Sequence, residues 1–569
     1  MSPEQPPEEP AISGPAAPAP PREVGRSRAA VVAAGIFSSR LVGFIRERAI
    51  AHFFGIGPYT DVLSTAFRGP NVLQVLFGEQ TLSAAFIPTY ARLIEEGREE
   101  DAGRFAGAIF GLLVAAAAVF SFAGVLLAKP IVAFFATGYL GDAALVAAGE
   151  KSVDRFALSV RAVRWVFPMT GILMLSAWCL GVLNSHRRFF LPYFAPVLWN
   201  SAIIVALILG SRSDPGAWWG SGREEGLLMT VCVGALIGGL LQFLVQLPST
   251  LRLLPSFRLS FSTRVPGVRR ALASFGPVFA GRGVVQISLY FESLLASLAA
   301  VGAVSAVRWG SFLYALPVSL FGISVAAAEL PELARAADRD PHQMVERARR
   351  SLRQMSFLVL PTAVGYVLFG FLVAGAIYRT GEFSRADNWL VYLVLCAYSL
   401  GLPAGTTSRL LQNLFYAVHD TRSPAKVAVL RVVVTVLIGA TLMFQLDRLP
   451  LARWIATGPG EELFLGAVGL ALGSAVGSWV ELWRLRAALH RRLDEVPSLR
   501  PPLPLVGLSL LAALPAGLLW WWLPPWPILA VAALVLGLYA ATYLGVSALL
   551  GLPELEAWRA QLRRRRRRS

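Results

Sequence analysis

Charged residues are scarce in this sequence. Of 569 residues only 15% are charged, whereas 55% are hydrophobic, and a soluble globular protein carries about 25% charged residues. Several runs contain no charge and are long enough to cross a bilayer, which takes about 20 helical residues. This composition excludes a soluble protein and indicates a polytopic membrane protein. The uncharged runs are 105–128, 189–211, 226–251, 354–378 and 501–553.

Cysteine, histidine and catalytic motifs are also scarce. The three cysteines, Cys179, Cys232 and Cys396, lie in apolar segments, which argues against disulfides and against a metal cluster. The five histidines are scattered, and the sequence contains no HExxH, GxSxG, Walker or CxxC motif. The sequence therefore predicts no enzyme, no cofactor and no metal site.

The order of apolar and polar segments predicts fourteen membrane spans between two tails. Residues 1–27, rich in Pro, Ala and Glu, cannot bury a core, so we expect a disordered tail. We predict a lobe of six spans over 28–250, a second over 251–500, two more spans over 501–552 and a basic tail over 553–569. The predicted spans are 29–54, 61–91, 105–128, 161–184, 190–210, 226–248, 273–300, 305–335, 354–378, 388–415, 427–446, 463–483, 503–523 and 527–550.

The distribution of basic residues predicts the orientation. With the N-terminus inside, 34 of the 52 Lys and Arg residues lie in inside segments and 9 in outside loops, as the positive-inside rule requires. Both termini are therefore predicted to be cytoplasmic. The net charge of +17 follows from the same asymmetry. We expect the run Arg563–Arg568 to lie at the anionic inner leaflet, with nucleic acid a weak second choice.

Short matches separated by 242–243 residues indicate an internal repeat. Phe37-Ser-Ser-Arg-Leu-Val42 resembles Phe279-Ala-Gly-Arg-Gly-Val284, and Ala85-Phe-Ile-Pro-Thr-Tyr-Ala-Arg92 resembles Ala328-Glu-Leu-Pro-Glu-Leu-Ala-Arg335. The offset carries span 1 onto span 7, so the halves share one orientation. The expected fold is an all-α membrane protein with two six-helix lobes in a parallel repeat and two C-terminal helices. This layout is typical of alternating-access transporters.

Charges inside the predicted spans carry the functional signal. A central intramembrane charge costs roughly 3 kcal/mol on insertion scales, so helices that face only lipid would not keep several. Any single arginine has the alternative of snorkelling to the interface or forming an ion pair. The nine arginines are Arg40, Arg46, Arg48, Arg68, Arg161, Arg164, Arg282, Arg308 and Arg409, and the acidic residues include Glu47, Asp61, Glu79, Glu292 and Glu329.

Four of these arginines are expected to line one cavity. Arg40 and Arg46 share span 1, Arg68 lies in span 2, and the repeat places Arg282 opposite Arg40. Because the planar guanidinium group suits phosphate and carboxylate, the cluster predicts an anionic substrate.

Proline interrupts the spans at related places in the two halves. Pro70 lies in span 2 and Pro317 in span 8. A proline inside a helix frees a carbonyl and permits a bend. Each is either a static kink or a hinge for lobe motion.

The motifs of the first two spans resemble the MurJ (MviN) lipid II flippase family of the MOP transporter superfamily. They are Phe37-Ser-Ser-Arg-Leu-Val-Gly-Phe-Ile-Arg-Glu47, Thr60-Asp61, Ala66-Phe-Arg-Gly-Pro-Asn71, Phe77-Gly-Glu-Gln80 and Ser83-Ala-Ala-Phe-Ile-Pro88. In the second half Gln286-Ile-Ser288, Ala303-Val-Ser305, Leu316-Pro317 and Leu330-Pro331 match in the same order. The resemblance implies a V-shaped fold and export of the undecaprenyl-linked peptidoglycan precursor lipid II.

The resemblance also implies site residues. The family's cavity arginines map onto Arg40 and Arg46, its acidic partner onto Glu47, where Asp is usual, and its aspartate onto Asp61. Arg68 takes a place usually held by lysine.

Two departures concern basic positions of the family. Gln74 and Phe312 stand where the family often has arginine. Arg308 lies one helical turn before Phe312 and so on the same face, and we expect Arg308, helped by Arg282, to supply the missing charge.

Alternative functions follow from the same features. A flippase for another lipid-linked oligosaccharide would use the same cavity, whereas a multidrug exporter of the same superfamily would need acidic cavity residues for cations. A membrane glycosyl- or acyltransferase would need clustered Asp or His. A scaffold that has lost transport is a further alternative, which the departures at Gln74 and Phe312 suggest. We predict lipid II and membrane lipids as partners, no nucleic acid, a monomer, and the bacterial cytoplasmic (inner) membrane as location.

Overall fold

The computed structural model describes residues 26–77, 79–456, 462–492, 503–524 and 526–556. Side chains in parts of some helices, 275–289 among them, lie outside this description. The described residues form α-helices joined by short 3-10 and π segments, with no β-strand among them. The predicted 1–27 tail and the run Arg563–Arg568 fall almost wholly or wholly outside the described residues.

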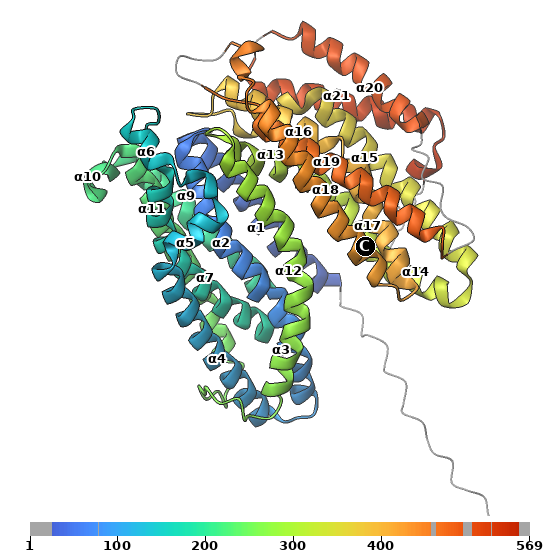
Figure 1. The fold of residues 1–569 in the computed structure, drawn as a ribbon. Helices are drawn as coiled ribbons and strands as arrows, with labels where there is room; N and C mark the ends of the chain where they lie inside the picture. The colour runs from blue at the N-terminus through green and yellow to red at the C-terminus, as the bar shows by residue number, and fades with distance from the viewer. Residues whose placement is uncertain (1–25, 78, 457–461, 493–502, 525, 557–569) are drawn as a thin grey trace, which may run out of the picture.

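The helices form two bundles (Figure 1). The first bundle comprises α1 (Arg26–Phe54), α2 (Pro58–Phe77), α3 (Glu79–Glu95), α4 (Glu99–Leu126), α5 (Ala128–Phe135), α6 (Asp142–Ala147), α7 (Arg155–Ser185), α8 (Phe190–Phe194), α9 (Pro196–Arg212), α10 (Pro215–Trp219) and α11 (Arg223–Leu251). The second bundle comprises α13 (Ala303–Pro317), α14 (Ser324–Arg339), α15 (Pro341–Tyr378), α16 (Arg385–Ser399), α17 (Leu402–Ala417), α18 (Arg422–Leu446), α19 (Gly466–Leu489), α20 (Leu503–Trp522) and α21 (Ile528–Leu549).

One helix belongs to neither bundle and packs on several helices of both. Helix α12 (Val268–Leu298) packs against α2, α3, α4 and α5 of the first bundle and against α13, α18 and α19 of the second. In Figure 1 the bundles approach each other where α1 finishes and lie further apart at the ends of α3 and α14. The two bundles therefore form the V shape that the resemblance implies, and α12 links its arms.

Length and apolarity identify most of the membrane spans. Nine described helices are long and apolar enough to cross a bilayer, or up to eleven if two bent helix pairs count as spans. Helices α1, α12 and α19, of 29, 31 and 24 residues, lie outside this set yet exceed the length that a bilayer requires. The all-helical membrane fold is confirmed, while the total of fourteen spans stays a prediction.

Close backbone contact joins α18 to α19. A side chain added at Gly473 would meet the backbone of Gly439, and one added at Gly469 would meet the backbone of Leu442. In lipid, dispersion contacts rather than the hydrophobic effect hold helices together, and small residues allow the close approach that these contacts need. The backbones of α18 and α19 therefore lie in close contact along this face.

The last two helices pack on the outside of the second bundle. The hydroxyls of Tyr539 and Tyr543 in α21 each donate to a backbone carbonyl of α15, Pro361 and Phe357, at 2.8 Å. Pro361 is inside α15 and leaves the carbonyl one turn before it without its helical partner. The appended helices therefore pack on α15.

The predicted orientation is testable with cysteine labelling. We expect Ala217→Cys to react with a membrane-impermeant thiol reagent in intact cells and Gln343→Cys to react only after lysis, in a chain whose native cysteines are replaced. Both side chains are exposed, so a lack of reaction reports the side of the membrane rather than burial. Labelling of residue 343 in intact cells would contradict the topology.

Candidate functional site

A polar cavity of about 180 Å³ lies where the first bundle meets α13. It collects charged side chains from α1, α2 and α13, and aromatic and apolar ones from α9 and α11. The lining residues are Arg46, Glu47, Ile50, Leu63, Ser64, Phe67, Arg68, Asn71, Trp199, Ile203, Val231, Arg308 and Ser311. The cavity therefore holds three arginines against one carboxylate.

Glu47 joins two of the arginines. Its side chain is buried, and Arg46 Nη2 lies 2.5 Å from Glu47 Oε1. From the other bundle, Arg308 Nη2 lies 2.9 Å from both carboxylate oxygens. Charge-assisted bonds of this kind are about twice as strong as neutral ones. Glu47 thus holds Arg46 and Arg308 together across the two bundles.

Neighbouring groups orient the same two arginines. Arg46 Nη1 donates to Asn200 Oδ1 at 2.9 Å, and its guanidinium carbon lies 4.8 Å from the centre of the Trp199 ring. Arg308 Nη1 donates to Ser64 Oγ at 3.2 Å. These contacts hold each guanidinium group in one orientation, with its charge at the cavity wall.

Arg68 is different from the other two. It lines the cavity but makes no hydrogen bond or ion pair with any residue that the structure describes. A guanidinium group has five donors and stays charged. Arg68 is therefore the cavity cation whose donors are available to an anion.

Some predicted site residues lie elsewhere. Arg40 is exposed and is not in the cavity lining. The side chain of Arg282 lies outside the described residues, so the structure does not place it. Pro70 is buried inside α2, and Pro317 ends α13 directly before a π-helix at Val318–Ile323. Helix α2 continues through Pro70, whereas α13 ends at Pro317; the role of both prolines as hinges stays a prediction.

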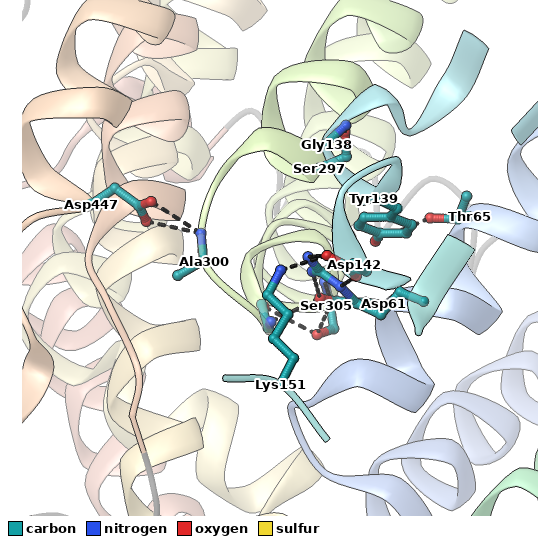
Figure 2. A network of polar contacts seen from close by, with 12 residues as sticks. Asp61, Thr65, Gly138, Tyr139, Asp142, Lys151, Ser297, Ala300, Ser305 and Asp447 are labelled. Atoms are coloured by element: carbon teal, nitrogen blue, oxygen red, sulfur yellow. Dashed lines mark hydrogen bonds and ion pairs between the residues drawn. The ribbon is translucent and has the colours of Figure 1, made fainter. Parts of the chain in front are cut away.

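Asp61 also lies outside the cavity lining, in a contact between the bundles (Figure 2). Its Oδ2 accepts from the backbone amide of Gly302 at 2.8 Å, and its Oδ1 accepts from the amide and the hydroxyl of Ser305 at 2.9 and 2.8 Å. Gly302 and Ser305 begin α13, so Asp61 from α2 caps a helix of the opposite bundle. A carboxylate is favourable at a helix N-terminus because the first amides lack partners there.

A second residue of the first bundle, Arg155, forms an ion pair with Asp61. Arg155 Nη1 lies 3.4 Å from Asp61 Oδ2, while Arg155 Nε donates to Asp142 Oδ2 at 2.6 Å. Lys151 Nζ lies 2.5 Å from Asp142, and the guanidinium carbon of Arg155 lies 4.2 Å from the Tyr139 ring centre. The carboxylate that crosses to α13 is thus paired and satisfied, as a buried charge must be.

Sequence reasoning missed Arg155 and Asp142. Both precede the predicted fourth span, in a segment that the predicted topology places outside. A signal was present in Asp154-Arg155, because an aspartate is a favoured N-cap residue, and Asp154 does accept from the amide of Ala157 at 3.0 Å. That signal marks the start of α7, but it does not reveal that Arg155 contacts Asp61.

Further contacts join the end of α1 to the second bundle. Arg48 Nη1 donates to the carbonyls of Ala376 and Ile377 at 2.7 and 2.9 Å, and the amide of Glu382 donates to the carbonyl of His52 at 2.9 Å. Together with Asp61, these bonds close the molecule at the end where α1 finishes. No group of three or more His, Cys, Asp or Glu among the described residues could hold a metal ion.

A family model described as "Lipid II flippase MurJ" matches residues 50–459, which is more than half of the chain. The chain belongs to the MurJ family. It is 30% identical over 531 residues to the lipid II flippase MurJ of Burkholderia cenocepacia, covering 90% of this chain and 95% of that protein. It is also 30% identical over 469 residues to the probable lipid II flippase MurJ of Rhizobium tropici, covering 81% and 80%.

Solved structures agree with the fold. A lipid II flippase MurJ in an inward closed conformation has a TM-score of 0.68 at 20% identity and covers 92% of this chain and 99% of that one. A multidrug MATE transporter of the MOP superfamily, in an inward-facing conformation, has a TM-score of 0.57 at 14% identity and covers 82% and 100%. The MurJ fold of this chain is therefore shared more distantly with MATE transporters.

The Asp61 contact is testable with a cysteine in the cavity. We expect Asp61→Asn to speed the labelling of Ser311→Cys by a reagent added outside, roughly tenfold, because losing charged hydrogen bonds costs about 1.5–3 kcal/mol. The native cysteines are replaced, and the rate is measured in intact cells.

Asp447→Asn is the matched control for that measurement. Asp447 Oδ2 also accepts from a backbone amide, that of Ala300 at 3.0 Å, in the turn that Figure 2 shows beside the Asp61 network. Neither residue belongs to the first bundle, so this variant should leave the labelling rate unchanged. Equal rates in both variants would show that Asp61 does not hold the bundles closed.

Proposed function

We propose that this chain moves lipid II from the inner to the outer leaflet of the bacterial inner membrane by alternating access. The observation that carries the proposal is the cavity between the bundles, which holds one carboxylate and three arginines, of which Arg68 has no hydrogen-bond or ion-pair partner among the described residues. The relatives named as lipid II flippases support the identity of the substrate.

The chemistry of the cavity suits a diphosphate. Lipid II is a disaccharide peptide joined to a polyprenyl chain by a pyrophosphate group. Arginine binds phosphate oxygens with two N–H donors that lie in one plane. Its guanidinium group also keeps its proton, and so its charge, in a cavity inside the membrane. The headgroup would contact Arg68 while the polyprenyl chain stays in lipid. Transfer of an anion outward gains about 2.3 kcal/mol per charge per 100 mV of inside-negative potential.

The contacts between the bundles support the transport cycle. The end of α1 is closed by Asp61 and by Arg48, whereas the opposite ends of the bundles lie apart (Figure 1). With the predicted orientation, this arrangement faces the cytoplasm. Opening to the other side would break the Asp61 contact, with Pro70 and Pro317 as hinges.

The cavity charges separate the alternatives. A MATE-like exporter of cations would need an excess of carboxylates, which the described lining does not have. A flippase for another lipid-linked oligosaccharide would share the diphosphate and remains the second candidate. We propose a monomer that acts as a transporter rather than an enzyme, with no nucleic-acid partner.

Complementation of a strain depleted of its own lipid II flippase tests the function. We expect the chain to restore growth, and Arg68→Ala and Arg46→Ala to abolish rescue at normal membrane abundance. The control is Arg161→Ala, because Arg161 pairs with Glu225 at the surface outside the cavity. Full rescue by both cavity variants would contradict an anion-binding role, and failure of the unmodified chain would contradict the proposed substrate.

Arg308 is proposed to supply the charge that the family usually places at residue 312. Its ion pair with Glu47 and the packing of Phe312 against Phe44, with ring centres 6.4 Å apart, support this exchange of positions. We expect Arg308→Ala to lose rescue and the added change Phe312→Arg to restore part of it, because one turn moves the charge only about 6 Å. A silent Arg308→Ala would refute the assignment.

A further inference from the structure

A half-buried carboxylate outside the cavity lining lies on a helix that packs against α2, which carries Arg68. Glu292 of α12 is half-buried and accepts a hydrogen bond from the hydroxyl of Tyr398 in α16. Tyr398 is itself buried and stacks on Tyr314 of α13, with ring centres 5.4 Å apart. The second bundle thus holds Glu292 in a defined position.

Glu292 and Arg68 carry opposite charges on two helices that pack on each other. Helix α12, which carries Glu292, packs directly on α2, which carries Arg68. The structure records no ion pair between Arg68 and Glu292, so their charged atoms are more than 4 Å apart. In this conformation Tyr398 holds the carboxylate, and Arg68 stays open to the cavity.

An empty carrier faces an electrostatic problem that such a carboxylate solves. When the substrate has left, the cavity must close around Arg68, and an uncompensated buried charge is strongly destabilising. A carrier that neutralises this arginine with a carboxylate of its own returns, when empty, to the substrate-binding state more readily than a carrier that cannot. A helix that contacts both bundles is well placed to bring the neutralising group, because a rearrangement of the bundles changes its packing.

We propose that Glu292 is an internal counterion that replaces the substrate diphosphate at Arg68 during the return of the empty carrier, and that Tyr398 withdraws it when the cavity faces the substrate. Glu292 is thereby a positioning residue rather than a binding residue. The inference rests on the proposed function, since it takes the diphosphate of lipid II as the competing anion.

The proposal predicts that substrate affinity and turnover change in opposite senses. Glu292→Gln removes the competitor, so the purified full-length chain in nanodiscs should bind fluorescent lipid II roughly tenfold more tightly, within the 5–150-fold range of coupled sites. Its turnover in proteoliposomes should fall, because the empty carrier returns slowly. A residue that only supported the fold would lower affinity and turnover together.

A second variant gives a change of opposite sign. Tyr398→Phe keeps the stacked ring but releases Glu292 to pair with Arg68, so lipid II binding should weaken several-fold. In an Arg68→Ala background, Glu292→Gln should change the affinity less than twofold, since the competition acts through that arginine. The matched control is Glu329→Gln, which removes a carboxylate paired with Arg347 at 2.9 Å outside the cavity and should leave the affinity unchanged.

The outcomes separate this proposal from the proposed function. If the unmodified chain does not bind lipid II, the proposed function fails and the counterion role fails with it. If the unmodified chain binds lipid II but Glu292→Gln binds no more tightly, or Tyr398→Phe binds no more weakly, the function stands and the counterion role is overturned. Should Glu292→Gln fail to accumulate in the membrane, the Tyr398→Phe measurement decides alone.

Discussion

The structure depends on keeping arginine charged inside an apolar protein. A guanidinium group cannot shed its proton in the membrane, so each buried one needs either a counterion or a polar cavity. Arg46 and Arg308 share Glu47, Arg155 shares Asp61 and Asp142, and Arg68 is left with the cavity. Three of these arginines thus meet the requirement with an ion pair. Arg68 meets it with the polar cavity, so its charge is available where the bundles meet.

Two different carboxylates of the first bundle connect it to α13. Asp61 caps the first amides of α13, and Glu47 binds Arg308 one turn further along. The first contact is made to backbone and the second to a side chain that also faces the cavity. A shift of α13 relative to α2 changes both contacts, so the closed end of the molecule and the cavity are mechanically linked.

The sequence predicted the membrane fold for reasons that are local, and of the four arginines expected to share one cavity the structure places Arg46 and Arg68 in the lining and Arg40 outside it. Long uncharged runs define spans, and Arg46, Glu47 and Arg308 stand out as charges inside them. Asp61 was also singled out, but its contact with Gly302 and Ser305 depends on how two distant bundles meet. Arg155 was missed because its role comes from three partners that no spacing in the sequence brings together.

The face of α2 that packs on α13 explains why the Asp61 contact, the Arg308 contact and Arg68 occur together. Asp61, Ser64 and Arg68 are three and four residues apart, which places them on one face of the helix, and α13 presents Ser305 and Arg308 three residues apart. Asp61 binds Ser305, and Ser64 binds Arg308, so the two faces are paired in register at two successive turns. Arg68 continues the same stripe by one more turn, about 6 Å, beyond the last recorded partner on α13. The unpaired arginine thus lies where the paired surface of the two helices ends and the cavity begins, and separating the helices at the Asp61 end must change the space in which Arg68 stands.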